Sequence, residues 1–169
     1  MRKELFVLNR EYQSSKKFGA VVFIIDRNNQ VYTQEEKELN ESTGKSPGSY
    51  SVVCETGLPG EEWDRNVVRG IVEEIGISED KLSKVLDSEM ICWETGFMEG
   101  VWASVVIIKC KDSNLFMELA GRSGGIDGVS PIGFLPRKDF ENLNLRQGVR
   151  NIINKFGDTI FNNGKTNFS

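Results

Sequence analysis

The 169-residue chain contains no histidine. This absence excludes pairs of serine or cysteine with histidine, histidine general bases, and zinc sites that mix cysteine with histidine. Any chemistry must therefore use carboxylates, lysine, arginine, tyrosine or a metal ion held by oxygen. The chain has 25 aspartate and glutamate residues that can supply such oxygens, so the question is which of these acids are organised into a site.

Cysteine, long apolar runs and excess positive charge are also scarce. The three cysteines have no framework spacing, and we expect reduced thiols. No run approaches the ~20 apolar residues of a membrane span, and the N-terminal stretch lacks the apolar segment of a signal peptide, so we expect a cytoplasmic protein without a membrane partner. The net charge of -4 argues against binding to duplex nucleic acid, although it allows a single small-molecule nucleotide to bind.

The length, with 38% hydrophobic and 27% charged residues, is typical of one globular domain. We therefore expect residues 1–169 to form a single domain, with a tail over 157–169 that lacks periodicity and is open to fraying.

Apolar runs and turn signals predict strands interleaved with two main helices, which favours an α/β or α+β sandwich. The polar stretch 35–49 and the glycine-rich stretch 120–128 are predicted loops, and 96–100 is a predicted turn. The helices are predicted from about residue 62 to Gly76 and over 145–156. The predicted strands are 18–26, 31–34, 49–53, 84–96, 101–110 and 130–136.

The first predicted helix, within "RNVVRGIVEEIGI" (65–77), has one unexpected residue in its middle. Gly70 costs roughly 0.5–1 kcal/mol relative to alanine in a helix interior. Gly76, by contrast, is well placed as a C-terminal cap. The apolar residues recur at spacings of three and four and predict one buried stripe, formed by Val67, Val68, Ile71, Val72 and Ile75.

The stretch "ETGLPGEEWDRNVVRGIVEEIGI" (55–77) resembles the Nudix box, whose signature is G-x5-E-x7-R-E-U-x-E-E-x-G-U, where U is a bulky aliphatic residue. The spacing fits without a gap. The two departures are Glu55, where the family has glycine, and Gly70, where it has glutamate. Seven of the nine specified positions match, namely Glu61, Arg69, Ile71, Glu73, Glu74, Gly76 and Ile77.

The resemblance implies a Nudix-like α/β/α sandwich with a mixed sheet, and a site that uses Mg²⁺ or Mn²⁺. The residues that match the family's metal ligands are Glu73 and Glu74, with Arg69 expected to orient carboxylates. Glu61 is expected to be a metal-site or structural acid. Asp127, in "GGIDG", is the best-placed acid after the box for a further metal ligand or base.

Plainer interpretations stay open for each residue. Adjacent glutamates on a helix often lie on a solvated face, Arg69 could form a surface ion pair, and Glu61 could simply favour the positive helix N-terminus. Gly70 marks either a lost carboxylate or close helix packing. Glu55 is either a turn residue or an acid that partly compensates for Gly70.

Three functions are compatible with the sequence. The first is a metal-dependent pyrophosphohydrolase of a nucleoside diphosphate linked to another group, slow or with a non-standard base. The second is a catalytically impaired Nudix-fold sensor that binds a nucleotide, and the third is an interaction protein that retains only the fold. The paired glutamates favour the first two. Because dimers are frequent in the resembling family, a homodimer also stays open.

Overall fold

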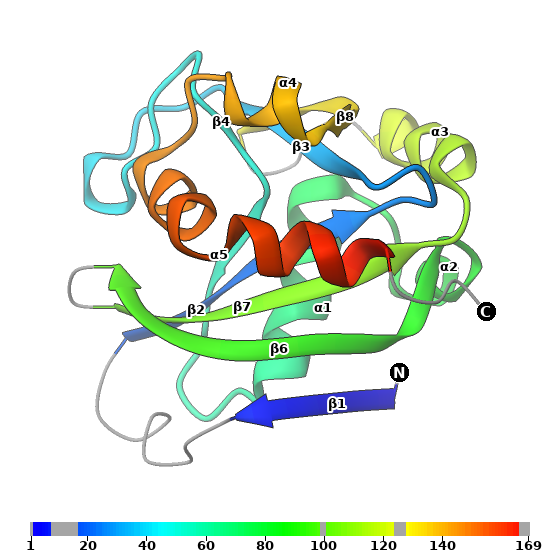
Figure 1. Ribbon diagram of the computed structural model, residues 1–169, viewed down its shortest axis with the longest axis horizontal. Coiled ribbons are helices and arrows are strands. Elements are labelled where there is room, and N and C mark those ends of the chain that lie inside the picture. The colour runs from blue at the N-terminus through cyan, green and yellow to red at the C-terminus, as the bar shows by residue number, and fades with distance from the viewer. Residues whose placement is uncertain (1, 8–16, 99–100, 124–127, 166–169) are drawn as a thin grey trace.

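The computed structural model describes residues 2–7, 17–98, 101–123 and 128–165, and it shows a mixed sheet between two layers of helices (Figure 1). The strand order is β1-β6-β7-β2-β3-β4, while β5 pairs with β2 and β8 pairs with β3. The strands are β1 (Arg2–Val7), β2 (Lys17–Ile25), β3 (Gln30–Glu36), β4 (Tyr50–Ser51), β5 (Val53–Thr56), β6 (Leu86–Met98), β7 (Val101–Cys110) and β8 (Val129–Pro136).

The helices are α1 (Trp63–Ile75), α2 (Glu79–Val85), α3 (Ser113–Ser123), α4 (Arg137–Glu141) and α5 (Gln147–Lys165), with a short 3-10 turn at Glu41–Thr43. One apolar core lies between the sheet and the layer of α1, α2 and α3, and a second lies beneath α4 and α5. The expected three-layer α+β sandwich with a mixed sheet is therefore confirmed. Every helix in the described ranges is too short or too polar to cross a lipid bilayer.

Strand β2 lies in the middle of the sheet and is apolar on both faces. It pairs in parallel with β7 and antiparallel with β5. Val22 and Ile24 point into the core beneath α1, while Val21 and Phe23 point into the other core. This arrangement explains the continuous apolar run, because a strand covered on both faces needs no alternation of polar residues.

Helix α1 forms as its sequence predicts. Val67, Ile71 and Ile75 are fully buried. Gly76 adopts φ 80°, and its N–H donates to the carbonyl of Val72 at 2.9 Å. A left-handed glycine thus ends the helix and turns the chain toward α2.

Three helices, α2, α3 and α4, and strand β1 lie where the sequence analysis predicted none. Residues 120–123, expected in a loop, belong to α3, whose Phe116 and Ala120 are buried against the sheet. Residues 84–85, expected at the start of a strand, end α2, and the predicted turn at 96–100 is strand β6 up to Met98. β1 exists because it pairs in parallel with β6, a long-range contact with no local signature.

Helix α5 corrects the expected tail. The helix was predicted to end at 156, but it continues to Lys165. Ile160 and Phe161 extend its buried stripe at helical spacing and pack into the second core. The end of the helix at 156 and the lack of periodicity after it are therefore wrong for 157–165, while fraying of the tail stays a prediction.

Candidate functional site

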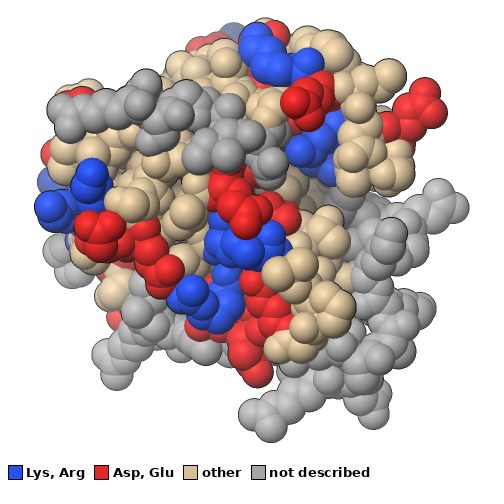
Figure 2. All heavy atoms as spheres, turned by 180° about the vertical axis from the view of Figure 1, so that it is seen from behind, with Lys and Arg blue, Asp and Glu red and all other residues tan. Residues whose placement is uncertain are grey.

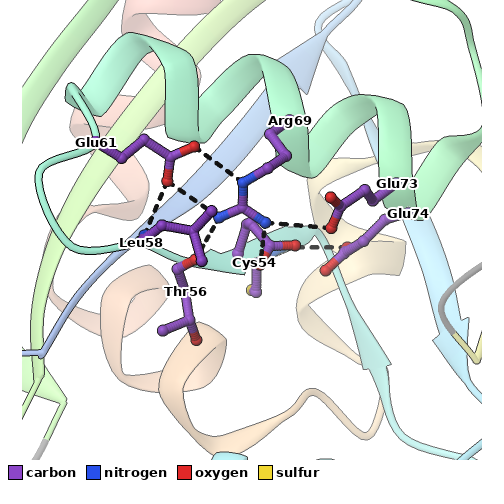
Figure 3. Close-up of polar contacts among 8 residues, drawn as sticks. Cys54, Thr56, Leu58, Glu61, Arg69, Glu73 and Glu74 are labelled. Atoms are coloured by element: carbon purple, nitrogen blue, oxygen red, sulfur yellow. Dashed lines mark hydrogen bonds and ion pairs between the residues drawn. The ribbon is translucent and has the colours of Figure 1, made fainter.

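Arg69 of α1 lies at the centre of a group of acidic side chains (Figure 3). Its Nε lies 2.9 Å from Oε1 of Glu61, while Nη1 lies 3.0 Å from Glu55 Oε1 and 3.2 Å from Glu73 Oε2. Nη2 donates to Oε2 of Glu61 at 3.1 Å and to the carbonyl of Thr56 at 2.6 Å. One guanidinium therefore ties β5, the loop that follows it and α1 together.

Glu61 anchors the loop that precedes α1. Its Oε2 accepts a hydrogen bond from the Leu58 amide at 2.9 Å. The hydrogen bonds from Arg69 are the main reason that the pKa of Glu61 lies below its usual value, and the pKa of Arg69 is raised in turn. Both groups are therefore charged at neutral pH, and the bidentate pair holds the loop against the helix.

The adjacent glutamates of α1 have different surroundings. The Glu73 side chain is 44% exposed and reaches Arg69. Glu74 is 1% exposed, and its Oε2 accepts hydrogen bonds from Nε2 of Gln34 at 2.5 Å and from the Cys54 amide at 3.3 Å. Burial is the main cause that raises the pKa of Glu74 to about 8. Glu74 therefore does not lie on a solvated face of the helix.

Gly70 lies where α1 comes closest to β5. A Cβ atom built on Gly70 would lie 2.6 Å from the Cβ of Glu55 and 3.4 Å from Val53 Cγ1. Close helix packing therefore accounts for the glycine. Glu55 is not a turn residue, because it belongs to β5 and pairs with Ala20 of β2.

A buried polar group beside Glu74 was not anticipated from the sequence. Gln34 and Glu36 of β3 are buried, as is Arg146, whose Nη1 lies 3.6 Å from Glu36 Oε1. Within the described part of the chain, Gln34 Oε1 and Glu36 Oε2 have no hydrogen-bond partner. The sequence feature that could have predicted this group is the spacing of Gln34 and Glu36. They lie two residues apart on one strand, so both share the face that carries the buried Tyr32.

The surface on this side of the molecule carries charges of both signs. α1 lies behind the sheet in Figure 1, and Figure 2 turns that side toward the viewer. Basic and acidic side chains gather next to one another on the described part of this face, rather than forming separate patches (Figure 2).

Solved structures with the same arrangement of strands and helices decide the fold. RenU, a Nudix hydrolase from M. smegmatis, matches with a TM-score of 0.53 at 11% identity, over 85% of this chain and 84% of its own. A Listeria monocytogenes protein assigned as a Nudix hydrolase matches with a TM-score of 0.52 at 10% identity, over 87% of this chain and 96% of its own. This chain has the Nudix fold.

A MutT structure, from work on the Aliivibrio salmonicida and Vibrio cholerae proteins, has the same Nudix fold. Its TM-score is 0.50 at 13% identity, over 90% of this chain and 98% of its own. No protein-family model matches the sequence, and no curated protein matches it either. At such identities the likeness establishes the Nudix fold and leaves the activity to be argued from the site.

The described residues fit only part of a metal site. Within the described ranges, no three acids or thiols come together in a way that could hold a metal ion. Mg²⁺, however, is usually held by only one or two carboxylates together with substrate phosphates and water. Glu73 and Glu74 are the two carboxylates of the described site that could supply so small a number of protein ligands. Asp127, the expected further ligand, lies outside the described residues.

Proposed function

We propose that this chain hydrolyses a diphosphate linkage in a nucleoside diphosphate joined to another group. The observation that carries the proposal is that Glu55, Glu61 and Glu73 converge on Arg69, with Glu74 of the same helix buried beside them, on a Nudix fold. Histidine, the commonest general base, is absent from the chain. Carboxylates and a divalent cation are therefore the groups that remain for this chemistry.

The proposed roles follow from the contacts of each side chain. Glu73 and Glu74 would hold Mg²⁺ or Mn²⁺, together with the substrate and a ligand such as Asp127. When bound, such a cation neutralises phosphate oxygens and activates water. Arg69 orients Glu73, and Glu61 fixes Arg69 and the loop at Leu58. Glu61 is therefore proposed to position the site, because Arg69 already binds both of its oxygens.

Slow turnover is part of the proposal. General-base assistance typically contributes about 10²–10⁴-fold to a rate. Position 70 carries no carboxylate, and both oxygens of Glu61 are engaged by Arg69. A site without an assigned base would still activate a phosphate through the cation, but slowly.

A second function is a nucleotide-binding sensor that does not cleave its ligand. The observation that favours it is the absence, among the described residues, of three acids placed to hold a metal ion. In that case the acids around Arg69 would serve to order the loop and α1.

The two functions are separated by product release from a panel of nucleotides. The panel contains ADP-ribose, dinucleoside polyphosphates, NADH and nucleoside triphosphates, each with Mg²⁺ and with Mn²⁺. Glu73→Gln and Glu74→Gln test the site, and Glu79→Gln, which breaks an exposed pair with Arg65, is the matched control. A hydrolase gives metal-dependent turnover that both site variants lose and the control keeps. A sensor leaves the panel uncut while one of its ligands raises the melting temperature.

A further inference from the structure

We propose that Glu55 and Gly70 are a matched pair, in which strand β5 supplies to the site beside Arg69 the carboxylate that helix α1 lacks at position 70. This inference rests on the proposed function, because it names a further acid of the same site. It also makes a separate claim about packing, namely that only one of the two positions can carry a side chain.

The packing claim follows from the distance between helix and strand. A Cβ at position 70 would lie 2.6 Å from Glu55 Cβ and 3.2 Å from Glu55 Cγ. The Glu55 Cβ is bonded directly to the strand backbone, so a rotation of the side chain cannot move it away. Gly70 is itself buried within α1. A side chain at position 70 therefore requires the helix or the strand to shift.

Pairing with β2 holds strand β5 in the sheet. The two strands are antiparallel, and a Cβ added on Gly19 of β2 would lie 2.9 Å from the carbonyl oxygen of Glu55. Glycines of two neighbouring elements, Gly19 of β2 and Gly70 of α1, thus lie close to Glu55. Because β5 is paired with β2, a side chain at position 70 would have to shift α1 or distort this part of the sheet.

The charge claim follows from the contacts of Glu55. Its carboxylate is only 13% exposed and lies 3.0 Å from Nη1 of Arg69, the residue directly before Gly70. Three carboxylates, those of Glu55, Glu61 and Glu73, share this one guanidinium. Three negative charges and one positive charge leave the group at a formal charge of -2, which would draw a divalent cation toward Glu73, although within the described residues these acids do not by themselves form a group of three that could hold the ion. Without Glu55 the group would retain only -1.

The packing claim is tested by melting temperatures alone. In the wild type, Gly70→Ala should lower the melting temperature by roughly 2–10 °C through overpacking. In a Glu55→Gly background, Gly70→Ala should instead raise the melting temperature by roughly 2–4 °C, because alanine has a higher helix propensity than glycine. Gly157→Ala is the matched control in α5, since its Cβ would meet the ends of two long side chains, those of Arg137 at 3.1 Å and Glu141 at 3.5 Å, and no backbone atom among those nearest to it.

The charge claim is tested by Mn²⁺ binding, followed by electron paramagnetic resonance with the metal alone. Glu55→Gln should weaken binding about 10-fold or more, and Glu79→Gln should not change it. The exchanged variant Glu55→Gly with Gly70→Glu should bind Mn²⁺ within about 3-fold of the wild type, because the acid returns from the helix side.

Melting temperatures and Mn²⁺ binding test the two parts of the proposal separately. If Gly70→Ala shifts the melting temperature equally in both backgrounds, the matched pair is wrong. If the packing cycle succeeds but Glu55→Gln binds Mn²⁺ as the wild type does, or the exchanged variant fails to recover binding, the supplied carboxylate is wrong. If the wild type binds no Mn²⁺ and cleaves nothing, the proposed function and the charge claim both fail, and the packing claim is decided by the melting temperatures.

Discussion

Replacing Arg69 with lysine tests whether one guanidinium organises the acidic group. Lysine keeps the positive charge but loses the planar fork that reaches Glu61 through two nitrogens and also reaches Glu55, Glu73 and the Thr56 carbonyl. Because a single ammonium cannot satisfy all of these acceptors, at least one carboxylate is left in a crowded acidic environment without its partner.

The expected loss lies between the values for buried and exposed ion pairs. Breaking a fully buried pair costs about 3–5 kcal/mol, whereas an exposed pair contributes about 0–1 kcal/mol. The side chains of Arg69 and Glu61 are 20% and 12% exposed. We therefore expect Arg69→Lys to lower the free energy of unfolding by about 2–3 kcal/mol, or the melting temperature by roughly 5–10 °C.

The assay is thermal and urea unfolding followed by circular dichroism, with Arg65→Lys as the matched control. Arg65 lies one turn earlier in α1 and pairs with Glu79 at 2.7 Å, but both side chains are 57% exposed. The control should lose less than about 1 kcal/mol. Equal losses in the two variants, or a shift below about 2 °C for Arg69→Lys, would refute the organising role of Arg69.

Three further predictions concern pH, a buried hydroxyl and metal removal. Burial raises the pKa of Glu74 from 4.5 to about 8, so the stability it contributes is present below pH 4.5 and is lost as the pH rises to 8. The wild type should therefore lose about 3 kcal/mol more of its free energy of unfolding than Glu74→Gln does between pH 5 and pH 7.5, as measured by urea unfolding. A difference between the two proteins that does not change with pH would contradict this. The Tyr32 hydroxyl is buried and has no hydrogen-bond partner among the described residues. Tyr32→Phe should therefore leave the melting temperature unchanged or raise it. A clear decrease would show that the hydroxyl has a partner. Since the described residues assemble no group of three metal ligands, EDTA should shift the melting temperature by less than about 1 °C, whereas a drop of several degrees would indicate a resident structural metal.

The sequence predicts those elements whose signals are local. Helix α1 was predicted from its apolar stripe and from Gly76, and β2 from its continuous apolar run. Helix α3 was missed because its glycine and serine residues near 120–123 have loop-like composition, while Phe116 and Ala120 stabilise the helix through contact with the sheet. Tertiary packing outweighs local propensity in such segments.

In the candidate site, too, the contacts between residues close in sequence could be predicted and those between distant residues could not. The spacing along the chain placed Glu61, Arg69 and Glu73 close to one another, because they lie on one helix and the loop before it. The contact between Glu55 and Gly70 was not predicted, since it depends on how closely β5 approaches α1. The position of Gln34 beside Glu74 also required the sheet, because 40 residues separate them in sequence.

The most direct test of the proposed hydrolase is the rate at which Glu74→Gln cleaves the substrate that the nucleotide panel identifies, with Mg²⁺ present and Glu79→Gln measured beside it. The proposed role of Glu74 predicts metal-dependent cleavage by the wild type and by Glu79→Gln, and a rate at least about 10²-fold lower in Glu74→Gln, which stays folded. Cleavage by Glu74→Gln at the wild-type rate would contradict the proposed site.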